Sequence, residues 1–320
     1  MIDLNKVKTS NEWKKARKEI VTRIENVLGK FPEEKPELQV KVVDEESFDG
    51  YTRKRIEYFV DEWERPSAWF FVPDGEDEVP AILCCHQTVP QGKNEPAGIS
   101  GDPNLAFALH YAKLGYATLA PDCITAGERV SYGKDPYDSS EFYKEHPGWS
   151  TMGKMLWDHM RAVDVLCDDR RVDGARIGVI GHSLGGHNAL MLAAFDERIQ
   201  VCVASCAFTR FADDDTPDRW AHAGLRYMPR LAKDIKKRTF PFDWEHVLAL
   251  IAPNPTLLLT ALNDECFSHT ESCEAAVAAA QKIYSLLGAP KALGIHTHEE
   301  GHGVTPELLD LADEWFDRWL

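Results

Sequence analysis

Short apolar runs alternate with amphipathic segments along most of the chain. A continuous apolar run, typical of a strand buried on both faces, lies at 79–87, and further strands are predicted at 116–122, 175–183, 199–207, 254–264 and 290–298. Apolar residues at helical spacing predict helices over 104–115, 151–169, 185–195 and 306–320. This alternation predicts an α/β fold with a mostly parallel, doubly wound sheet and helices on both faces. In such a sheet the binding site lies beyond the carboxyl ends of the strands.

The N-terminal part and two long connections depart from this alternation. A helix over 11–29 and two strands of a hairpin, 53–63 and 66–75, precede the alternating part. The connections 122–150 and 208–248 exceed the usual few residues, and long loops in compact domains are often lids or substrate walls. Surface elaboration is the alternative. We expect one domain over 1–320, with eight strands, an N-terminal helix and hairpin at about 10–75, and two lid-like insertions.

The composition and charge of the chain argue against some classes of binding partner and indicate a cellular compartment. The net charge of −16 argues against nucleic acid and anionic membranes, because phosphate binding needs a basic face. The N-terminus has no apolar core of a secretory signal, and no apolar run approaches the ~18 residues of a membrane span. We therefore expect a cytoplasmic protein. The eight cysteines are scattered without a C-x-x-C pair, which gives a thiolate zinc site little support.

One short motif indicates a catalytic nucleophile. Residues 181–185 read GHSLG, a G-x-S-x-G pattern preceded by a β-type run and followed by a helical one. That context fits a nucleophile elbow, a sharp strained turn in which glycines allow close backbone packing and a helix N-terminus favours a developing oxyanion. An ordinary Gly-rich turn is the plain alternative. We predict Ser183 as the nucleophile.

A serine nucleophile needs a base and an orienting acid, in the chain order Ser, Asp or Glu, His on this fold. Asp264 follows a predicted strand directly, and His302 follows the last strand in a Gly-flanked loop. We predict this pair as acid and base. His298 is the main rival base, although the pleat of the strand fixes its direction. Rival acids are Glu265 and the run Asp213, Asp214 and Asp215 after an earlier strand.

The C-terminal stretch HEEGH, residues 298–302, matches the zinc-protease pattern H-E-x-x-H. That pattern binds zinc only on a helix, where both histidines share one face. Gly301 interrupts the match, Gly303 follows it, and a β-type run leads into it; each glycine costs about 1 kcal/mol in a helix. We therefore predict no metal site and no cofactor.

The oxyanion hole and the pocket walls are assigned by position. The backbone N–H of Leu184, after the nucleophile, and one from Gln87 or Thr88, after the strand 79–87, would hold the oxyanion. Candidate substrate contacts are His86, His182, Arg129, Trp149, Trp220 and Tyr227. For each there is a structural alternative: the aromatic rings could pack the long loops, Arg129 could pair with Glu128, and His182 could support its neighbours.

The run DDRRVDGARIGVIGHSLGGHNALMLAAFDERIQVCVAS resembles the α/β-hydrolase superfamily, and most closely its dienelactone-hydrolase and acetyl-xylan-esterase-like branch. Its VDGARIGVIGHSLGG portion is also similar to prolyl-oligopeptidase-type domains. The resemblance implies an α/β-hydrolase fold and a triad of Ser183, Asp264 and His302. Dienelactone hydrolases use Cys as nucleophile, so the serine here favours an esterase.

These features together predict a serine esterase that cleaves a small acyl group from a sugar or aromatic alcohol. A peptidase or amidase would share the triad, and a binding protein on the same fold is the third class. A small-molecule ester is the expected partner, with neither nucleic acid nor membrane, and no feature of the sequence specifies an oligomeric state.

Overall fold

The computed structural model describes residues 1–222 and 225–320. In this described part, nine strands form one sheet in the order β1-β2-β3-β5-β4-β6-β7-β8-β9. Pairing is antiparallel from β1 to β5 and parallel from β5 to β9. The strands are β1 (Lys41–Phe48), β2 (Tyr51–Glu57), β3 (Ser67–Pro73), β4 (Val79–Cys85), β5 (Ala117–Pro121), β6 (Val172–His182), β7 (Ile199–Ser205), β8 (Thr256–Ala261) and β9 (Leu293–His298).

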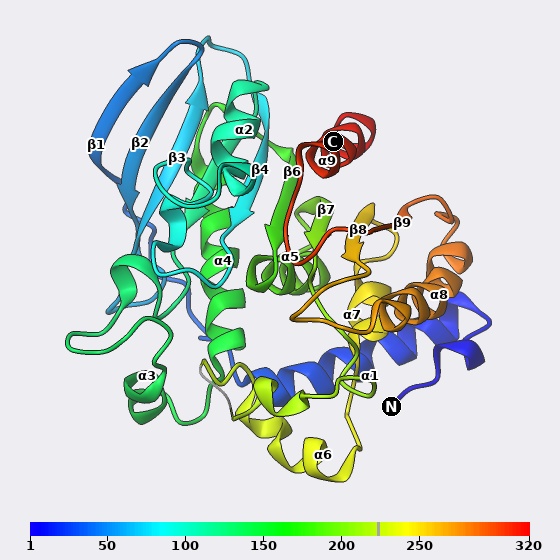
Figure 1. The fold of residues 1–320 in the computed structure, drawn as a ribbon. Coiled ribbons are helices and arrows are strands. Elements are labelled where there is room, and N and C mark those ends of the chain that lie inside the picture. The colour runs from blue at the N-terminus through cyan, green and yellow to red at the C-terminus, as the bar shows by residue number, and fades with distance from the viewer. Residues whose placement is uncertain (223–224) are drawn as a thin grey trace.

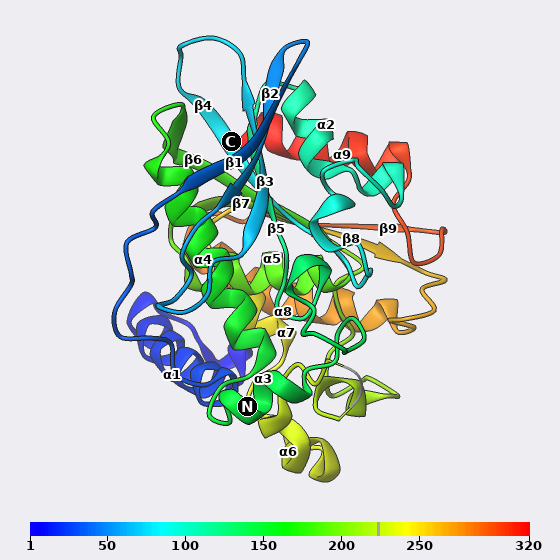
Figure 2. The same ribbon diagram turned by 90° about the vertical axis from the view of Figure 1, so that its left-hand side faces the viewer.

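Helices cover both faces of the sheet (Figures 1 and 2). They are α1 (Ser10–Leu28), α2 (Phe107–Lys113), α3 (Ser140–Glu145), α4 (Thr151–Asp168), α5 (Leu184–Phe195), α6 (Ala232–Lys237), α7 (Trp244–Ile251), α8 (Thr270–Leu286) and α9 (Pro306–Trp319). One buried apolar cluster joins the sheet to α1, α4, α5, α7 and α8, and a second joins its other face to α2 and α9. This arrangement confirms the predicted doubly wound α/β-hydrolase fold.

The prediction of eight strands is wrong by one, because β1 carries no apolar signal. Its sequence KVVDEESF is exposed along its whole length, as suits a charged edge strand that discourages pairing with other chains. The predicted hairpin is present as β2 and β3, which pair from Tyr51↔Pro73 to Glu57↔Ser67. Its first strand ends at Glu57 instead of residue 63.

The long connections contain short helices that the sequence pattern did not predict. α3 lies within 122–150, and α6 and the start of α7 lie within 208–248. α8 was also missed, since its buried face mixes polar and small residues (Thr270, Ser272, Ala276 and Ala280) with few large apolar ones and so gives a weak hydrophobic period. In Figure 1 both α3 and α6 lie below the sheet, α3 on the side of β1 and α6 below α1. No helix in the described ranges is long and apolar enough to cross a bilayer.

Candidate active site

Ser183 lies in the sharp turn between β6 and α5. Its φ and ψ angles are 54° and −118°, a left-handed conformation that a residue with a side chain rarely adopts. The flanking glycines permit the turn. A Cβ on Gly181 would lie 2.2 Å from the backbone of Gly185, and a Cβ on Gly185 would lie 2.2 Å from the carbonyl oxygen of Cys85. The G-x-S-x-G spacing thus produces a strained elbow that lifts one side chain out of the sheet.

A hydrogen-bond chain joins Ser183, His302 and Asp264. The Ser183 Oγ atom lies 2.9 Å from Nε2 of His302, and Nδ1 of that imidazole lies 2.9 Å from both carboxylate oxygens of Asp264. An ionised carboxylate only accepts, so Nδ1 carries the proton and Nε2 is free to accept from the serine hydroxyl. The three residues come from the ends of β6, β8 and β9, which meet at one edge of the sheet.

The surroundings of Asp264 hold it ionised. Burial opposes ionisation, but the hydrogen bond from His302 and those from the backbone N–H groups of Phe267 and Cys266 outweigh it. The two backbone bonds measure 2.8 and 2.7 Å. The pKa of this carboxyl is therefore below its ordinary value, and the charged form faces the imidazole.

The rival acids face other partners. Asp213 pairs with Arg210 and accepts a hydrogen bond from the Ser272 hydroxyl at 2.7 Å. Asp214 is buried and accepts from the indole of Trp220 at 3.0 Å. Asp215 lies 2.8 Å from the His269 ring, and Glu265 is exposed.

The end of β9 determines the position of both the rival base, His298, and the HEEGH segment that resembles a zinc motif. His298 is the last residue of β9 and is buried, and the following residues form a turn that carries His302 to Ser183. The HEEGH segment is therefore a strand end and a loop, not a helix.

Within the described residues, Cys206, Asp264 and His302 form a group whose possible metal-ligand atoms lie within 4.8 Å of one another. Burial and the Asp264 charge raise the pKa of the Cys206 thiol to about 12, which disfavours the thiolate that a metal would need.

The loop after β4 approaches the elbow, as the oxyanion-hole prediction requires. Gln87 and Thr88 line the same pocket as Ser183, and Leu184 begins α5 with its side chain in a buried cluster. His86 does not line this pocket, contrary to the expected substrate contact. Its Nδ1 donates to the Gln87 carbonyl at 2.6 Å, and its Nε2 accepts from the backbone N–H of Cys123 at 2.9 Å. His86 is thus a buried support of the loop.

The pocket at Ser183 has a volume of about 440 Å³. Trp220 and Tyr227, two of the expected substrate contacts, line it; that they contact substrate stays a prediction. The complete lining consists of Gln87, Thr88, Tyr137, Ser183, His187, Arg219, Trp220, Leu225, Tyr227, Cys266, Phe267 and His302. The connection 208–248 therefore supplies a wall of the pocket, whereas movement of that connection as a lid stays a prediction.

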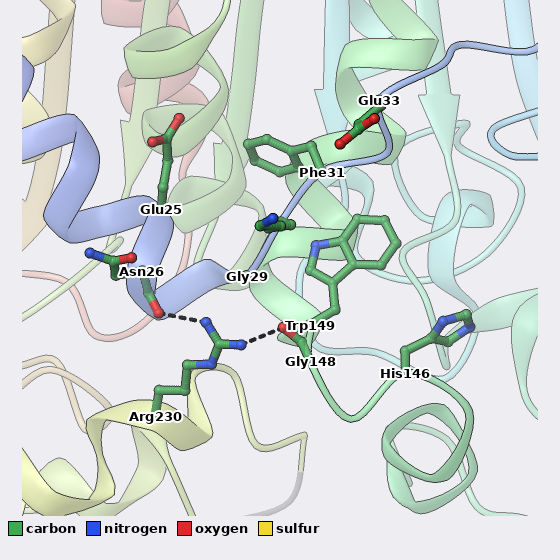
Figure 3. Close-up of a pocket in the computed structure, with 10 residues that line it drawn as sticks. Glu25, Asn26, Gly29, Phe31, Glu33, His146, Gly148, Trp149 and Arg230 are labelled. Atoms are coloured by element: carbon green, nitrogen blue, oxygen red, sulfur yellow. Dashed lines mark hydrogen bonds between the residues drawn. The ribbon is translucent and has the colours of Figure 1, made fainter.

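Three predicted contacts lie outside this pocket. The Arg129 side chain is buried in an ionic cluster, 2.7 Å from Glu64 and 2.8 Å from Asp158, and does not pair with Glu128. His182 is buried behind the elbow, where its Nδ1 lies 3.0 Å from the Ser205 hydroxyl. Trp149 lies in a different pocket of about 790 Å³ between the end of α1 and the start of α4, in which Arg230 bonds two backbone carbonyls (Figure 3).

Six residues of the pocket wall were not predicted from the sequence: Tyr137, His187, Arg219, Leu225, Cys266 and Phe267. His187 follows Ser183 by four positions on α5, so the helical period alone places it on the same side of the helix. Phe267 and Tyr137 come from irregular segments and Arg219 from a 3-10 helix of four residues, Pro217–Trp220, which is too short for a hydrophobic period to fix the direction of a side chain.

The sheet order, the elbow and the serine–histidine–aspartate contact define an α/β-hydrolase. A family model described as "Abhydrolase family" matches residues 1–300, and the chain belongs to this family. The Bacillus subtilis (strain 168) protein YtaP is 28% identical over 304 residues, covering 92% of this chain and 96% of that protein.

Two solved structures share the fold at low sequence identity. A glucuronoyl esterase from Solibacter usitatus superposes with a TM-score of 0.78 at 20% identity, covering 97% of this chain and 94% of that one. An acetyl xylan esterase from Paenibacillus sp. R4 gives a TM-score of 0.62 at 20% identity, covering 98% and 97%.

Proposed function

We propose that this protein is a serine hydrolase that cleaves a carboxylic ester through an acyl-enzyme, with Ser183, His302 and Asp264 as its triad. The observation that carries the proposal is the hydrogen-bond chain from the Ser183 hydroxyl through the imidazole to the carboxylate, each link 2.9 Å long. Ser183 and His302 line a pocket, and Ser183 stands on the strained turn that nucleophilic serines occupy in this fold.

Each side chain has one task in the reaction. As Ser183 Oγ attacks the acyl carbon, Nε2 of His302 takes its proton, and Asp264 holds the imidazole in the required tautomer and stabilises its charged form. The protonated imidazole then gives that proton to the departing alcohol. In the second half of the reaction a water molecule attacks the acyl-enzyme, with His302 again as the base, and the carboxylic acid leaves.

The oxyanion that forms in each step needs N–H donors. The backbone N–H of Leu184, at the N-terminus of α5, is one donor, and the loop at Gln87 and Thr88 supplies the second. The dipole of the 12-residue helix α5 adds to the stabilisation of negative charge at this end.

We infer that the substrate is a small ester with a carbohydrate component. The printed names of two structures of the same fold, a glucuronoyl esterase and an acetyl xylan esterase, support this choice, as does the aromatic lining of the pocket by Trp220, Tyr227 and Phe267. The expected cytoplasmic location and the absence of macromolecular partners stay predictions.

The first test measures hydrolysis of p-nitrophenyl esters from acetate to octanoate by the wild type and Ser183→Ala, with and without EDTA. We expect turnover to fall by at least about 10⁴-fold in Ser183→Ala and to be indifferent to EDTA. Activity that survives Ser183→Ala but is lost with EDTA would overturn the proposal. A matched anilide of the best acyl group, measured beside its ester, separates an esterase from an amidase.

A further inference from the structure

His187 is a buried polar residue of the pocket for which the proposed reaction has no use. It lies on α5 one helical turn after Ser183, and its backbone N–H donates to the Ser183 carbonyl at 3.0 Å. Its side chain lines the same pocket as Ser183 and His302, yet the residue is only 3% exposed. Residues four apart on a helix have Cβ atoms about 5–6 Å apart, so this ring stands beside the nucleophile.

Neither ring nitrogen of His187 makes a hydrogen bond of good geometry with the described residues, although the ring lies near the backbone of Ala207 and gains a weak contact there. Leaving a buried polar atom unpaired is unfavourable, and an unpaired atom at a pocket wall is therefore well placed to bind a ligand. Burial, with smaller electrostatic contributions from the neighbouring His302 and Arg219 side chains, lowers the pKa of this imidazole to about 3. The ring is thus neutral at working pH, with one N–H donor and one acceptor nitrogen.

Aromatic rings surround the imidazole. Its centroid lies 4.8 Å from that of Trp220, 5.6 Å from Phe267 and 5.8 Å from Tyr227, and all three of these rings also line the pocket. The wall around His187 is consequently largely aromatic, with rings set at different angles, and the imidazole adds polar atoms to it. A ligand that fits it presents C–H faces to the rings and one hydroxyl to the imidazole, which can both donate to and accept from that hydroxyl.

Other ligand classes fit this wall less well. A plain alkyl group would leave the imidazole nitrogens unpaired. An anionic group needs a free cation, but His187 is neutral and the Arg219 guanidinium is already 3.0 Å from the buried carboxylate of Asp214. Arg219 also stacks over the Phe267 ring at 5.2 Å, which fixes it in the wall.

We propose that His187 is a specificity-determining residue that binds a hydroxyl of a sugar-like ring held beside Ser183. The pocket therefore selects hydroxylated cyclic esters over hydrocarbon esters of the same shape. This inference rests on the proposed esterase activity and names its substrate class. The ring could belong to the acyl part, as in an ester of a sugar acid, or to the alcohol part, as in an acetylated sugar; the shared chemistry is the ring hydroxyl.

The test compares kcat/KM for two matched pairs of esters. The first pair is the methyl ester of a methyl hexuronoside against methyl cyclohexanecarboxylate, and the second is a mono-acetylated methyl hexoside against cyclohexyl acetate. We expect the wild type to prefer the hydroxylated ester in one pair, which identifies the side of the ester that binds at His187. In His187→Phe this preference ratio should fall about tenfold to a hundredfold, mainly through KM, whereas His187→Gln should keep part of it.

A matched control is His159→Phe, since His159 is equally buried on α4 but does not line the pocket. Its preference ratio should equal that of the wild type. The inference is overturned if the wild type shows no preference in either pair, which can be measured without any variant. It is also overturned if His187→Phe lowers kcat/KM for both esters of a pair by the same factor. Failure of the underlying esterase proposal would give a different result. The wild type would hydrolyse neither these esters nor p-nitrophenyl acetate, or Ser183→Ala would be as active as the wild type.

Discussion

The backbone of Gly185 rests against the carbonyl oxygen of Cys85 so closely that a Cβ atom at Gly185 would lie 2.2 Å from it. This contact joins the start of α5 to the end of β4, the strand from which the loop with Gln87 and Thr88 departs. The elbow and the oxyanion loop are therefore held in register by backbone packing. No side chain, even a methyl group, fits between them without moving one of the two.

The first prediction follows from this contact. Gly185→Ala should lower the free energy of unfolding by about 2 kcal/mol or more, because the methyl group overpacks two rigid backbones. It should also lower kcat, since relief of the clash separates the two oxyanion donors. Chemical denaturation and ester hydrolysis measure the two effects.

Gly301→Ala is the matched control, because the nearest heavy atom to its Cβ would be 3.8 Å away. Its stability should stay within about 0.5 kcal/mol of the wild type, as for a surface substitution. If Gly185→Ala were as stable and as active as Gly301→Ala, the close packing of the elbow would not constrain the site.

The second prediction separates the candidate acids by their effect on turnover. Asp264→Asn should lower kcat by about 10⁴-fold, because an amide cannot hold Nδ1–H of His302 in the tautomer that leaves Nε2 free. Asp213→Asn should change kcat only a few-fold, since Asp213 contacts Arg210 and Ser272 and not the imidazole. A large loss in Asp213→Asn with a small one in Asp264→Asn would reverse the assignment. The measurement is single-turnover hydrolysis at pH 7.

The third prediction concerns acid stability. The folded pKa of Asp264 lies below its ordinary value of 3.8, so the folded protein binds fewer protons there than the unfolded chain. The stabilisation is complete above the unfolded pKa and is lost as the pH falls through the folded pKa. The difference in unfolding free energy between wild type and Asp264→Asn should therefore shrink on titration from pH 6 to pH 3. A difference in unfolding free energy that stayed constant over this pH range would contradict the prediction.

Asp243 has a pKa shift in the opposite direction to that of Asp264, so its contribution to stability should depend on pH in the opposite sense. Burial and the neighbouring Glu245 raise its pKa to about 7, although it accepts hydrogen bonds from backbone N–H groups of Phe211, Ala212 and Trp244. Here the folded state binds more protons between about pH 4 and 7, so its contribution to stability falls as the pH rises through that window. Relative to Asp243→Asn, the wild type should gain stability on acidification from pH 7 to pH 4.

The sequence was sufficient for the parts of the molecule that obey a period or a motif. Buried parallel strands such as β4 and β6 are continuous apolar runs, and the elbow at Ser183 has a fixed spacing of small residues, so their positions were predicted to within a few residues. β1 was not predicted because an exposed edge strand carries no apolar signal.

The pocket wall was predicted only in part, and the reason is long-range packing. Trp149 and Trp220 look alike in the sequence, both on long loops. Trp220 is drawn into the site by its indole hydrogen bond to Asp214, whereas Trp149 lies against the start of α4 in the separate pocket of Figure 3. Arg129 was similarly ambiguous, since its buried partners are 65 positions earlier and 29 positions later in the chain.

The last prediction concerns that ionic cluster, which ties the connection 122–150 to α4. The Lys154 ammonium is buried and lies 2.5 Å from Asp158 and 2.8 Å from Glu64, and Arg129 contacts the same two carboxylates. Removing the ammonium leaves the buried Asp158 carboxylate with Arg129 as its remaining partner, and breaking a buried ion pair typically costs about 3–5 kcal/mol. Lys154→Met should therefore lower the unfolding free energy by about this amount, as measured by chemical denaturation.

The double variant Lys154→Met/Asp158→Leu tests whether the ionic cluster contributes only to stability or also to catalysis. Replacing both partners of a buried pair by apolar residues is often neutral, so we expect the double variant to recover at least half of the stability lost in Lys154→Met. Arg129 would keep Glu64 as its partner in that variant. Because the cluster lies outside the pocket at Ser183, its kcat on p-nitrophenyl acetate should follow the folded fraction. If activity fell while the protein stayed folded, the cluster would have to position the connection 122–150 for catalysis, through Tyr137, which belongs to both the connection and the pocket wall.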